Sequence, residues 1–138
     1  MAESGTPPFV DTNVLVRYLT DDPPELAERA ARVIESEEQL TVSELVLVEA
    51  AYVLTTVYEI PRVSAVDALI ELVQRRNLAL LHLAKPLAIE ALRLSRDSGR
   101  VSFADAFLWA HARQAGADTV YTFDTRFPTQ GLARAFMP

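Results

Sequence analysis

Four acidic residues stand in apolar or otherwise unusual surroundings, and together they have the chemistry of a divalent metal site. They are Asp11, Glu49, Asp105 and Asp124. An ionised carboxylate among apolar side chains is costly unless hydrogen-bond donors, a cation or a metal compensates for it. Magnesium and manganese prefer carboxylate and water oxygens, so acids drawn from distant segments predict one shared metal site.

Glu49 carries most of this argument, because the helix predicted from Glu44 to Tyr58 is otherwise apolar around it. The residues one helical turn away are Leu45, Val46, Tyr52 and Val53, and we expect this face to point into the protein. No cap, turn or cation four residues away explains an acid there. The remaining structural alternative is a buried ion pair with a distant arginine.

Each of the other three acids has a local structural explanation. Asp11 could be the N-cap of a helix over Thr12 to Thr20, and Asp105 could form a capping box with Ser102. Asp124 could simply form a turn. Taken alone, capping is favoured for Asp105 and a turn for Asp124, whereas the two explanations of Asp11 are balanced. Four acids near one sheet edge favour a shared cause.

Short β-like runs alternate with longer helical ones along the chain. The expected strands are Phe9-Val10, Leu40 to Val42, Leu78 to Leu83 and Thr119 to Phe123. The expected helices are Thr12 to Thr20, Pro24 to about Glu37, Glu44 to Tyr58, Ala65 to Arg76, Pro86 to Ser98-Gly99 and Phe103 to Gln114. Since helical crossovers join parallel strands, the predicted fold is a small α/β three-layer sandwich, with a short, mostly parallel central sheet flanked by helices.

The expected fold gives the four acids a common place. In open parallel sheets, functional groups gather beyond the carboxyl ends of the strands, where Asp11 and Asp124 fall directly. Glu49 lies about two helical turns after a strand, and Asp105 lies in the first turn of its helix, so both could lean over the same edge. Helix starts are expected at Ser43, at Ser64 with Asp67 as a capping box, and at Ser102, with Gly116 ending the last helix.

Composition narrows the class of protein. With 138 residues and half of them apolar, the chain fits a single domain over residues 1–138. The absence of cysteine excludes disulfides, thiolate metal sites and cysteine nucleophiles. Met1 to Pro8 does not resemble a secretory signal, and no apolar run approaches the ~20 residues of a membrane span, so we expect a cytoplasmic protein without a membrane segment.

The charge balance argues only weakly against nucleic acid. The net charge is −6, and removing the four site carboxylates leaves −2. Arg93, Arg96 and Arg100 recur at helical spacing and could follow a phosphate backbone, although a solvated helix face is the simpler interpretation. His82 and His111 lack the spacing of zinc ligands and are interpreted as structural or surface residues.

Four sequence motifs resemble a known family. They are Val10 to Leu15, Ser43 to Glu49, Ser102 to Ala106 and Thr122 to Asp124, and in this order they are similar to the acidic motifs of PIN-domain nucleases, with the VapC-type toxins as the nearest group. The resemblance extends from Phe9 to about Phe127. It implies an α/β domain that cuts RNA with Mg²⁺ or Mn²⁺, commonly as a homodimer, and a toxin would also have a cognate antitoxin.

The resemblance also implies roles for individual residues. The acidic metal-binding and catalytic set would be Asp11, Glu49, Asp105 and Asp124, with Thr12, Asn13 and Ser43 as polar support. Asp11 and Asp105 are the first choices for direct metal ligands. Two positions depart from the family, because many relatives carry further acids where Ser102 stands and near Arg126. These departures leave open whether one or two metals bind.

Metal-assisted hydrolysis of the phosphodiester is the expected mechanism, because a bound metal activates water and stabilises the leaving oxygen. An antitoxin segment is expected in an apolar groove between the early helices and the Glu49 helix. Two alternatives remain. One is an aspartate-based phosphotransfer domain, although Asn13 stands where a phosphatase would have its second Asp. The other is a PIN-fold interaction domain without activity.

Overall fold

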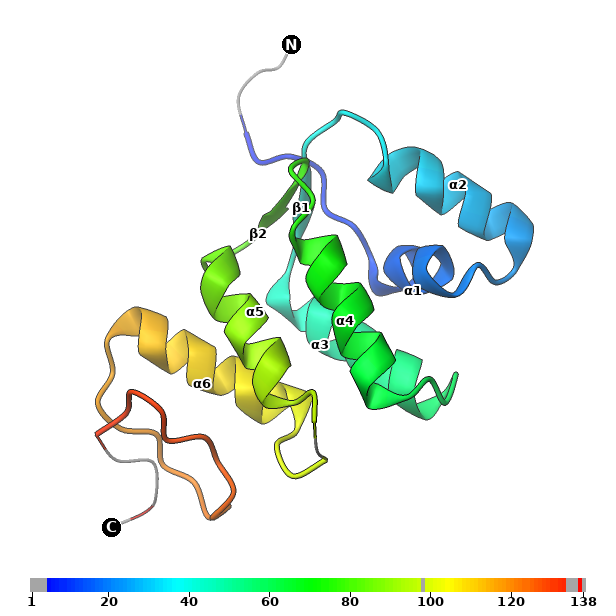
Figure 1. The fold of residues 1–138 in the computed structure, drawn as a ribbon. Coiled ribbons are helices and arrows are strands. Elements are labelled where there is room, and N and C mark those ends of the chain that lie inside the picture. The colour runs from blue at the N-terminus through cyan, green and yellow to red at the C-terminus, as the bar shows by residue number, and fades with distance from the viewer. Residues whose placement is uncertain (1–4, 98, 134–136, 138) are drawn as a thin grey trace.

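The computed structural model describes residues 5–97, 99–133 and 137. Its helices are α1 (Thr12–Thr20), α2 (Pro24–Ile34), α3 (Glu44–Thr56), α4 (Arg62–Val73), α5 (Lys85–Leu94) and α6 (Phe103–Ala115), and its strands are β1 (Leu40–Val42) and β2 (Leu78–Leu80). In Figure 1 the contacting helices α1 and α2 lie to the right of the strands, while α5 and α6, which also contact each other, lie to the left and below.

The sheet is short and parallel, as predicted. β1 pairs with β2 in parallel, with Val42 opposite Leu80. On the other side of β1, Phe9 forms a parallel bridge with Thr41, so that the residues following Val10 lie level with those following Val42. The predicted helix-flanked α/β sandwich is therefore confirmed, and the carboxyl ends of these segments meet at one edge.

Local signals place several helices as expected. α1 covers the predicted residues and is capped by Asp11, whose side chain accepts the N–H of Thr12. Ser43 caps α3 through the N–H of Leu45, and Ser102 caps α6 through the N–H of Asp105. α6 ends at Gly116 in the left-handed conformation (φ 77°), which costs glycine little because it has no Cβ.

The expected capping box at Ser64 is wrong. α4 begins at Arg62, with Pro61 at the N-cap and no side-chain hydrogen bond there. Asp67, the supposed partner of Ser64, instead binds Arg96 through two hydrogen bonds of 2.8 and 2.9 Å. α5 also ends earlier than expected, at Leu94, and Ser98 of its predicted boundary lies outside the described residues. Consequently Arg96 and Arg100 do not extend a basic stripe along that helix.

Three expected strands are shorter than predicted, and Phe9-Val10 forms only the isolated bridge at Phe9. β2 stops at Leu80, because the N–H groups of His82 and Leu83 bind the Glu44 carboxylate rather than a neighbouring strand. The run Thr119 to Phe123 forms only a single bridge position at Thr119. Its β-branched and aromatic residues do not make a strand there, since β-propensity reflects packing on a pleated surface more than a backbone preference.

The helices cover the sheet around one core. Trp109, Leu47, Leu54, Leu69 and Leu92 are among its fully buried side chains, contributed by α3, α4, α5 and α6. α3 contacts α1, α4 and α6, and so it occupies a central place among the helices. None of the described helices is long and apolar enough to cross a membrane.

Candidate active site

Asp11 and Glu49 come together at the sheet edge, joined by Thr12. The Thr12 hydroxyl donates a 2.6 Å hydrogen bond to Oε1 of Glu49, and the Thr12 N–H donates one of 2.7 Å to Oδ1 of Asp11. Both acids line one cavity of about 380 Å³ between α1 and α3, together with Asn13 and Arg17. Two carboxylates from distant parts of the sequence, Asp11 and Glu49, thus border one solvent-accessible pocket.

Glu49 reaches this pocket from an exposed face of α3, so the expectation that it is buried is wrong. Two of the four neighbours that were expected to bury it are themselves open to solvent, with Leu45 81% and Tyr52 62% exposed, while Val46 and Val53 are only partly buried. The buried face of α3 consists instead of Leu47, Ala50, Ala51 and Leu54. Because the helix is apolar on both faces, periodicity could not tell which face packs against the core.

Glu49 also faces the start of α6, where Asp105 stands. It lines a second, apolar cavity of about 510 Å³ with Tyr52 on one side and Ser102 and Phe103 on the other. Asp105 follows in the first turn of α6, half-buried, and its backbone N–H binds the Ser102 hydroxyl at 3.0 Å. No described residue donates a hydrogen bond to the Asp105 carboxylate, which leaves its oxygens available to a ligand.

Asp124 is held by Arg126. The guanidinium contacts the two Asp124 oxygens at 3.1 and 3.4 Å, and the Arg126 N–H adds a 2.8 Å bond to Oδ1. These bonds lower the pKa of Asp124, and the same pairing raises the pKa of Arg126, with a further contribution from the charge of Asp105. Arg126 is therefore mainly the partner of Asp124. Asp124 also forms the turn that its local sequence suggested.

The residues expected to give polar support divide into two groups. Thr12 and Asn13 line the pocket shared by Asp11 and Glu49, and Thr12 holds Glu49 directly. Ser43 serves α3 instead, because its hydroxyl accepts the Leu45 N–H at 3.1 Å. Thr12 thus supports the site by direct contact, whereas Ser43 acts through the start of the helix that carries Glu49.

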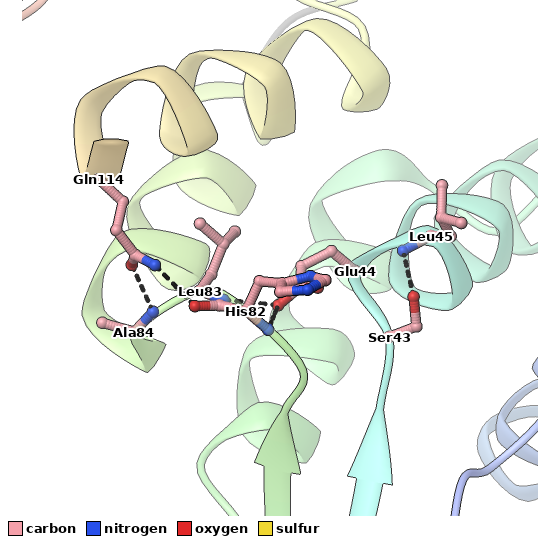
Figure 2. A network of polar contacts seen from close by, with 7 residues as sticks. All are labelled: Ser43, Glu44, Leu45, His82, Leu83, Ala84 and Gln114. Atoms are coloured by element: carbon pink, nitrogen blue, oxygen red, sulfur yellow. Dashed lines mark hydrogen bonds and ion pairs between the residues drawn. The ribbon is translucent and has the colours of Figure 1, made fainter. Parts of the chain in front are cut away.

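The buried acid of α3 is Glu44, which the sequence reasoning missed. Figure 2 shows its side chain beyond the ends of both strands, where Oε2 accepts the N–H groups of His82 and Leu83 at 2.8 and 2.7 Å. Gln114 of α6 completes the network by accepting the Ala84 N–H and donating to the His82 carbonyl oxygen. An acid directly after the N-cap Ser43 was the available signal, since this position favours negative charge.

The pKa of Glu44 is lowered despite its burial. Burial alone raises it, but hydrogen bonds from the N–H groups of Leu83, His82 and Glu44 itself outweigh that effect, and the nearby His111 contributes in the same direction. The side chain is therefore a satisfied, ionised anchor that joins α3 to the segment following β2. Its bonds fix the start of α3, the helix that carries Glu49, against the segment following β2.

The donor set of the candidate site fits a hard divalent cation. Mg²⁺ is commonly held by one or two carboxylates with waters and substrate phosphates rather than by a complete protein cage. Asp11 and Glu49 at one pocket match this pattern. No group of three or more Asp, Glu or His side chains in the described part of the chain is placed to hold a metal ion together, so Asp105 and Asp124 do not join Asp11 and Glu49 in one ligand group. The two histidines lie near each other, with ring centroids 6.5 Å apart.

Comparison with known proteins identifies the class to which this acidic α/β domain belongs. The PIN domain family matches residues 9–131. The chain therefore belongs to the PIN-domain family, as its four motifs predicted. No curated protein matches it significantly.

Among solved structures, this chain is similar to the crystal structure of VapC20 from Mycobacterium tuberculosis, which is described as a toxin that cleaves the sarcin–ricin loop. The two are 24% identical, with a TM-score of 0.42, and the match covers 90% of this chain and 95% of that one.

Proposed function

We propose that this PIN domain is a metal-dependent endoribonuclease that hydrolyses RNA phosphodiester bonds. The observation that carries the proposal is the joint pocket of Asp11 and Glu49, held together by Thr12. Membership of the PIN-domain family and the unbonded carboxylate of Asp105 at the start of α6 support it. Asp124, which Arg126 holds, would complete the acidic set.

The proposed division of labour follows from what each side chain is free to do. Asp11 caps α1 with Oδ1 only, which leaves its other carboxylate oxygen for the ion. The Asp105 carboxylate accepts no hydrogen bond from the described residues, so it can also hold the ion directly. Glu49, oriented by the Thr12 hydroxyl, can accept a proton from the attacking water or position that water. A bound Mg²⁺ or Mn²⁺ would lower the pKa of a coordinated water and stabilise charge on the phosphoryl group.

RNA cleavage by the Asp11→Asn protein tests the proposal. Asparagine is also a good N-cap, so α1 should remain intact while the negative charge is lost. We expect cleavage to fall at least about a hundredfold, since even residues that only support metal ligands change activity ~10–100-fold. The matched control is Asp97→Asn, which makes the same change at an exposed acid paired with Arg96.

Cleavage is measured during titration with Mg²⁺ and with Mn²⁺, and circular dichroism reports the fold. A folded Asp11→Asn protein that cuts RNA at the wild-type rate contradicts the proposal. An oligonucleotide containing a sarcin–ricin loop is one useful substrate, and an unstructured RNA is the other.

We propose further that the nuclease is a VapC-type toxin with a protein antitoxin and that it acts in the cytoplasm. A groove of about 500 Å³ between α1 and α2 is lined by apolar Leu26 and Val33 and by the cations Arg17 and Arg29. It shares Asn13 and Arg17 with the acidic pocket. An amphipathic partner helix carrying acids could occupy it and also block the site.

Two measurements address these partners. A small open reading frame next to the gene, encoding a DNA-binding protein that suppresses cleavage, is expected for a toxin. The Arg29→Glu protein should bind that partner more weakly because its charge is reversed at the rim of the groove. A homodimer is also proposed, with exposed Leu45 and Tyr52 of α3 available to a second copy, and light scattering measures the oligomeric state.

A further inference from the structure

Arg17 is a cation in the lining of the pocket that Asp11 and Glu49 share. Its Nη1 donates a 3.2 Å hydrogen bond to the backbone oxygen of Asp22. A guanidinium has five N–H donors in a planar fork, and the other four have no hydrogen-bond partner in the described part of the chain. The side chain is only half-buried, so these donors can bind an anion that enters the pocket.

The pocket has two ends of different character. At one end the Thr12 hydroxyl of α1 binds Glu49 of α3. At the other end Asp22 accepts a hydrogen bond from Arg17 through its backbone oxygen and one of 3.3 Å from the Tyr58 hydroxyl through Oδ2. Arg17 stands five positions after Thr12 in α1, about 7.5 Å further along the helix axis. The acids and the guanidinium therefore line different ends of one pocket.

The charges around the pocket leave a role for this cation. Asp11 and Glu49 line the pocket, and Asp22 adds a third carboxylate at the end where Arg17 lies. With one divalent ion bound, these three carboxylates would keep a single negative charge, and Arg17 brings the group to neutral. Without Arg17, an incoming phosphate would meet net negative charge beside the metal.

We propose that Arg17 binds the RNA phosphate next to the one that is cut. This inference rests on the proposed nuclease function and adds a phosphate subsite to it. The phosphate that is cut must lie with the metal at the end of Asp11 and Glu49, so the guanidinium at the other end meets the neighbouring phosphate of the strand. The planar fork of arginine matches two phosphate oxygens, and the bond to Asp22 holds the side chain in place.

The Arg17→Gln protein separates this role from a purely structural one. Glutamine can still donate an N–H to the Asp22 backbone oxygen, but it has no positive charge. Anisotropy measures binding of a short fluorescein-labelled single-stranded RNA to the full-length protein in EDTA, over a range of KCl concentrations. Losing one phosphate contact should weaken binding about tenfold and reduce the slope of log K against log salt by about 0.7. Arg17→Lys should keep the slope, because it keeps the charge.

The matched control is Arg29→Gln. Arg29 lines the groove between α1 and α2, as Arg17 does, but it does not line the acidic pocket. Its loss should change the slope much less than the loss of Arg17. Circular dichroism reports the fold of both variants. Equal decreases in slope would overturn the inference, because the effect would then be one of general charge, and so would an unchanged slope in a folded Arg17→Gln protein.

The second test identifies the phosphate. A methylphosphonate, which is neutral, replaces in turn the phosphate at the mapped cleavage position and each of its two neighbours. One neighbouring replacement should weaken binding to the wild type about tenfold and leave binding to Arg17→Gln unchanged, because both changes remove the same contact. Such coupling at the cleaved phosphate, or additive losses at every position, would refute the assignment.

Cleavage separates the two levels of the proposal. A wild-type protein that cuts no RNA with Mg²⁺ or Mn²⁺ refutes the nuclease function and the inference that rests on it. In a protein that does cut, Arg17→Gln should raise KM with little change in kcat, because the neighbouring phosphate is bound equally before and during the reaction. If the variant cuts and binds RNA as the wild type does, the nuclease function stands and the role of Arg17 is refuted.

Discussion

Two glutamates of α3 show how differently one helix can use the same side chain. Glu44, in the first turn, is 4% exposed and accepts two backbone N–H groups from the segment that follows β2. Glu49, five positions later, is exposed and accepts a single hydroxyl hydrogen bond from Thr12. The first carboxylate is buried and one of its oxygens already accepts two N–H groups, whereas the second keeps acceptor capacity beside a pocket.

The contrast shows that burial alone is a poor guide to a functional acid. A buried carboxylate whose acceptors are filled by N–H groups stabilises the fold and has little left to offer a ligand. A carboxylate at a pocket rim, oriented by one contact, can still bind a cation or a water. The roles assigned to Glu44 and Glu49 can therefore be separated by measuring stability and activity in the same variants.

The largest expected effect is on stability, in Glu44→Ala. This change leaves the N–H groups of His82 and Leu83 without their acceptor, and the Leu83 N–H is buried, where an unsatisfied group costs about 1–3 kcal/mol. We expect the free energy of unfolding to fall by about 3 kcal/mol, as measured by urea denaturation. The control is Glu49→Ala, which should change it by less than about 0.5 kcal/mol because Glu49 is exposed. Equal losses in the two variants would erase the distinction between the glutamates.

The next effect is on activity, in Glu49→Gln. The amide can still accept the Thr12 hydrogen bond but lacks the charge needed to attract a cation or a proton. Cleavage of RNA should fall about tenfold or more while the unfolding midpoint stays unchanged. Full activity of the Glu49→Gln protein would show that cleavage does not need the Glu49 carboxylate and that Glu49 is an ordinary surface residue.

A smaller effect is expected in acid. The pKa of Glu44 is lowered in the folded state, so its stabilising contribution is complete above its ordinary value of 4.5 and is lost as the pH falls through the folded-state value. The stability difference between the wild type and Glu44→Gln should therefore shrink as the pH is lowered below about 4.5. Denaturation curves of both proteins at about pH 7, 5 and 3.5 measure this stability difference. A difference that grows in acid would contradict the predicted sign.

The smallest effect is expected in Thr12→Val, which keeps the shape of the side chain and removes its hydroxyl. Glu49 then loses the 2.6 Å bond that orients it, while Asp11 still caps α1 through the backbone N–H of residue 12. Stability should fall by about 1 kcal/mol or less. Cleavage should fall by less than in Glu49→Gln, since the carboxylate is retained. A larger activity loss than in Glu49→Gln would give the hydroxyl a role of its own.

Local sequence signals predicted much of the fold. The β1 residues and the α1 residues match their predicted ranges, and the caps at Ser43 and Ser102 were also found. The signals failed where a tertiary partner decides. The N–H groups after Leu80 bind Glu44 instead of extending β2, and Asp67 binds Arg96 instead of capping α4 with Ser64. The aromatic run Thr119 to Phe123 has strand-forming residues but little strand pairing.

The same division applies to the candidate site. By itself, the sequence determined the family. The order and residue types of the four acidic motifs can be read from the chain without knowledge of any tertiary contact. Only the tertiary structure decided that Glu44 is the buried acid, that Glu49 shares a pocket with Asp11, and that Arg126 lies on Asp124. The physical reason is that helical periodicity fixes which side chains share a face, while the packing of α3 against α1, α4 and α6 decides which face is covered.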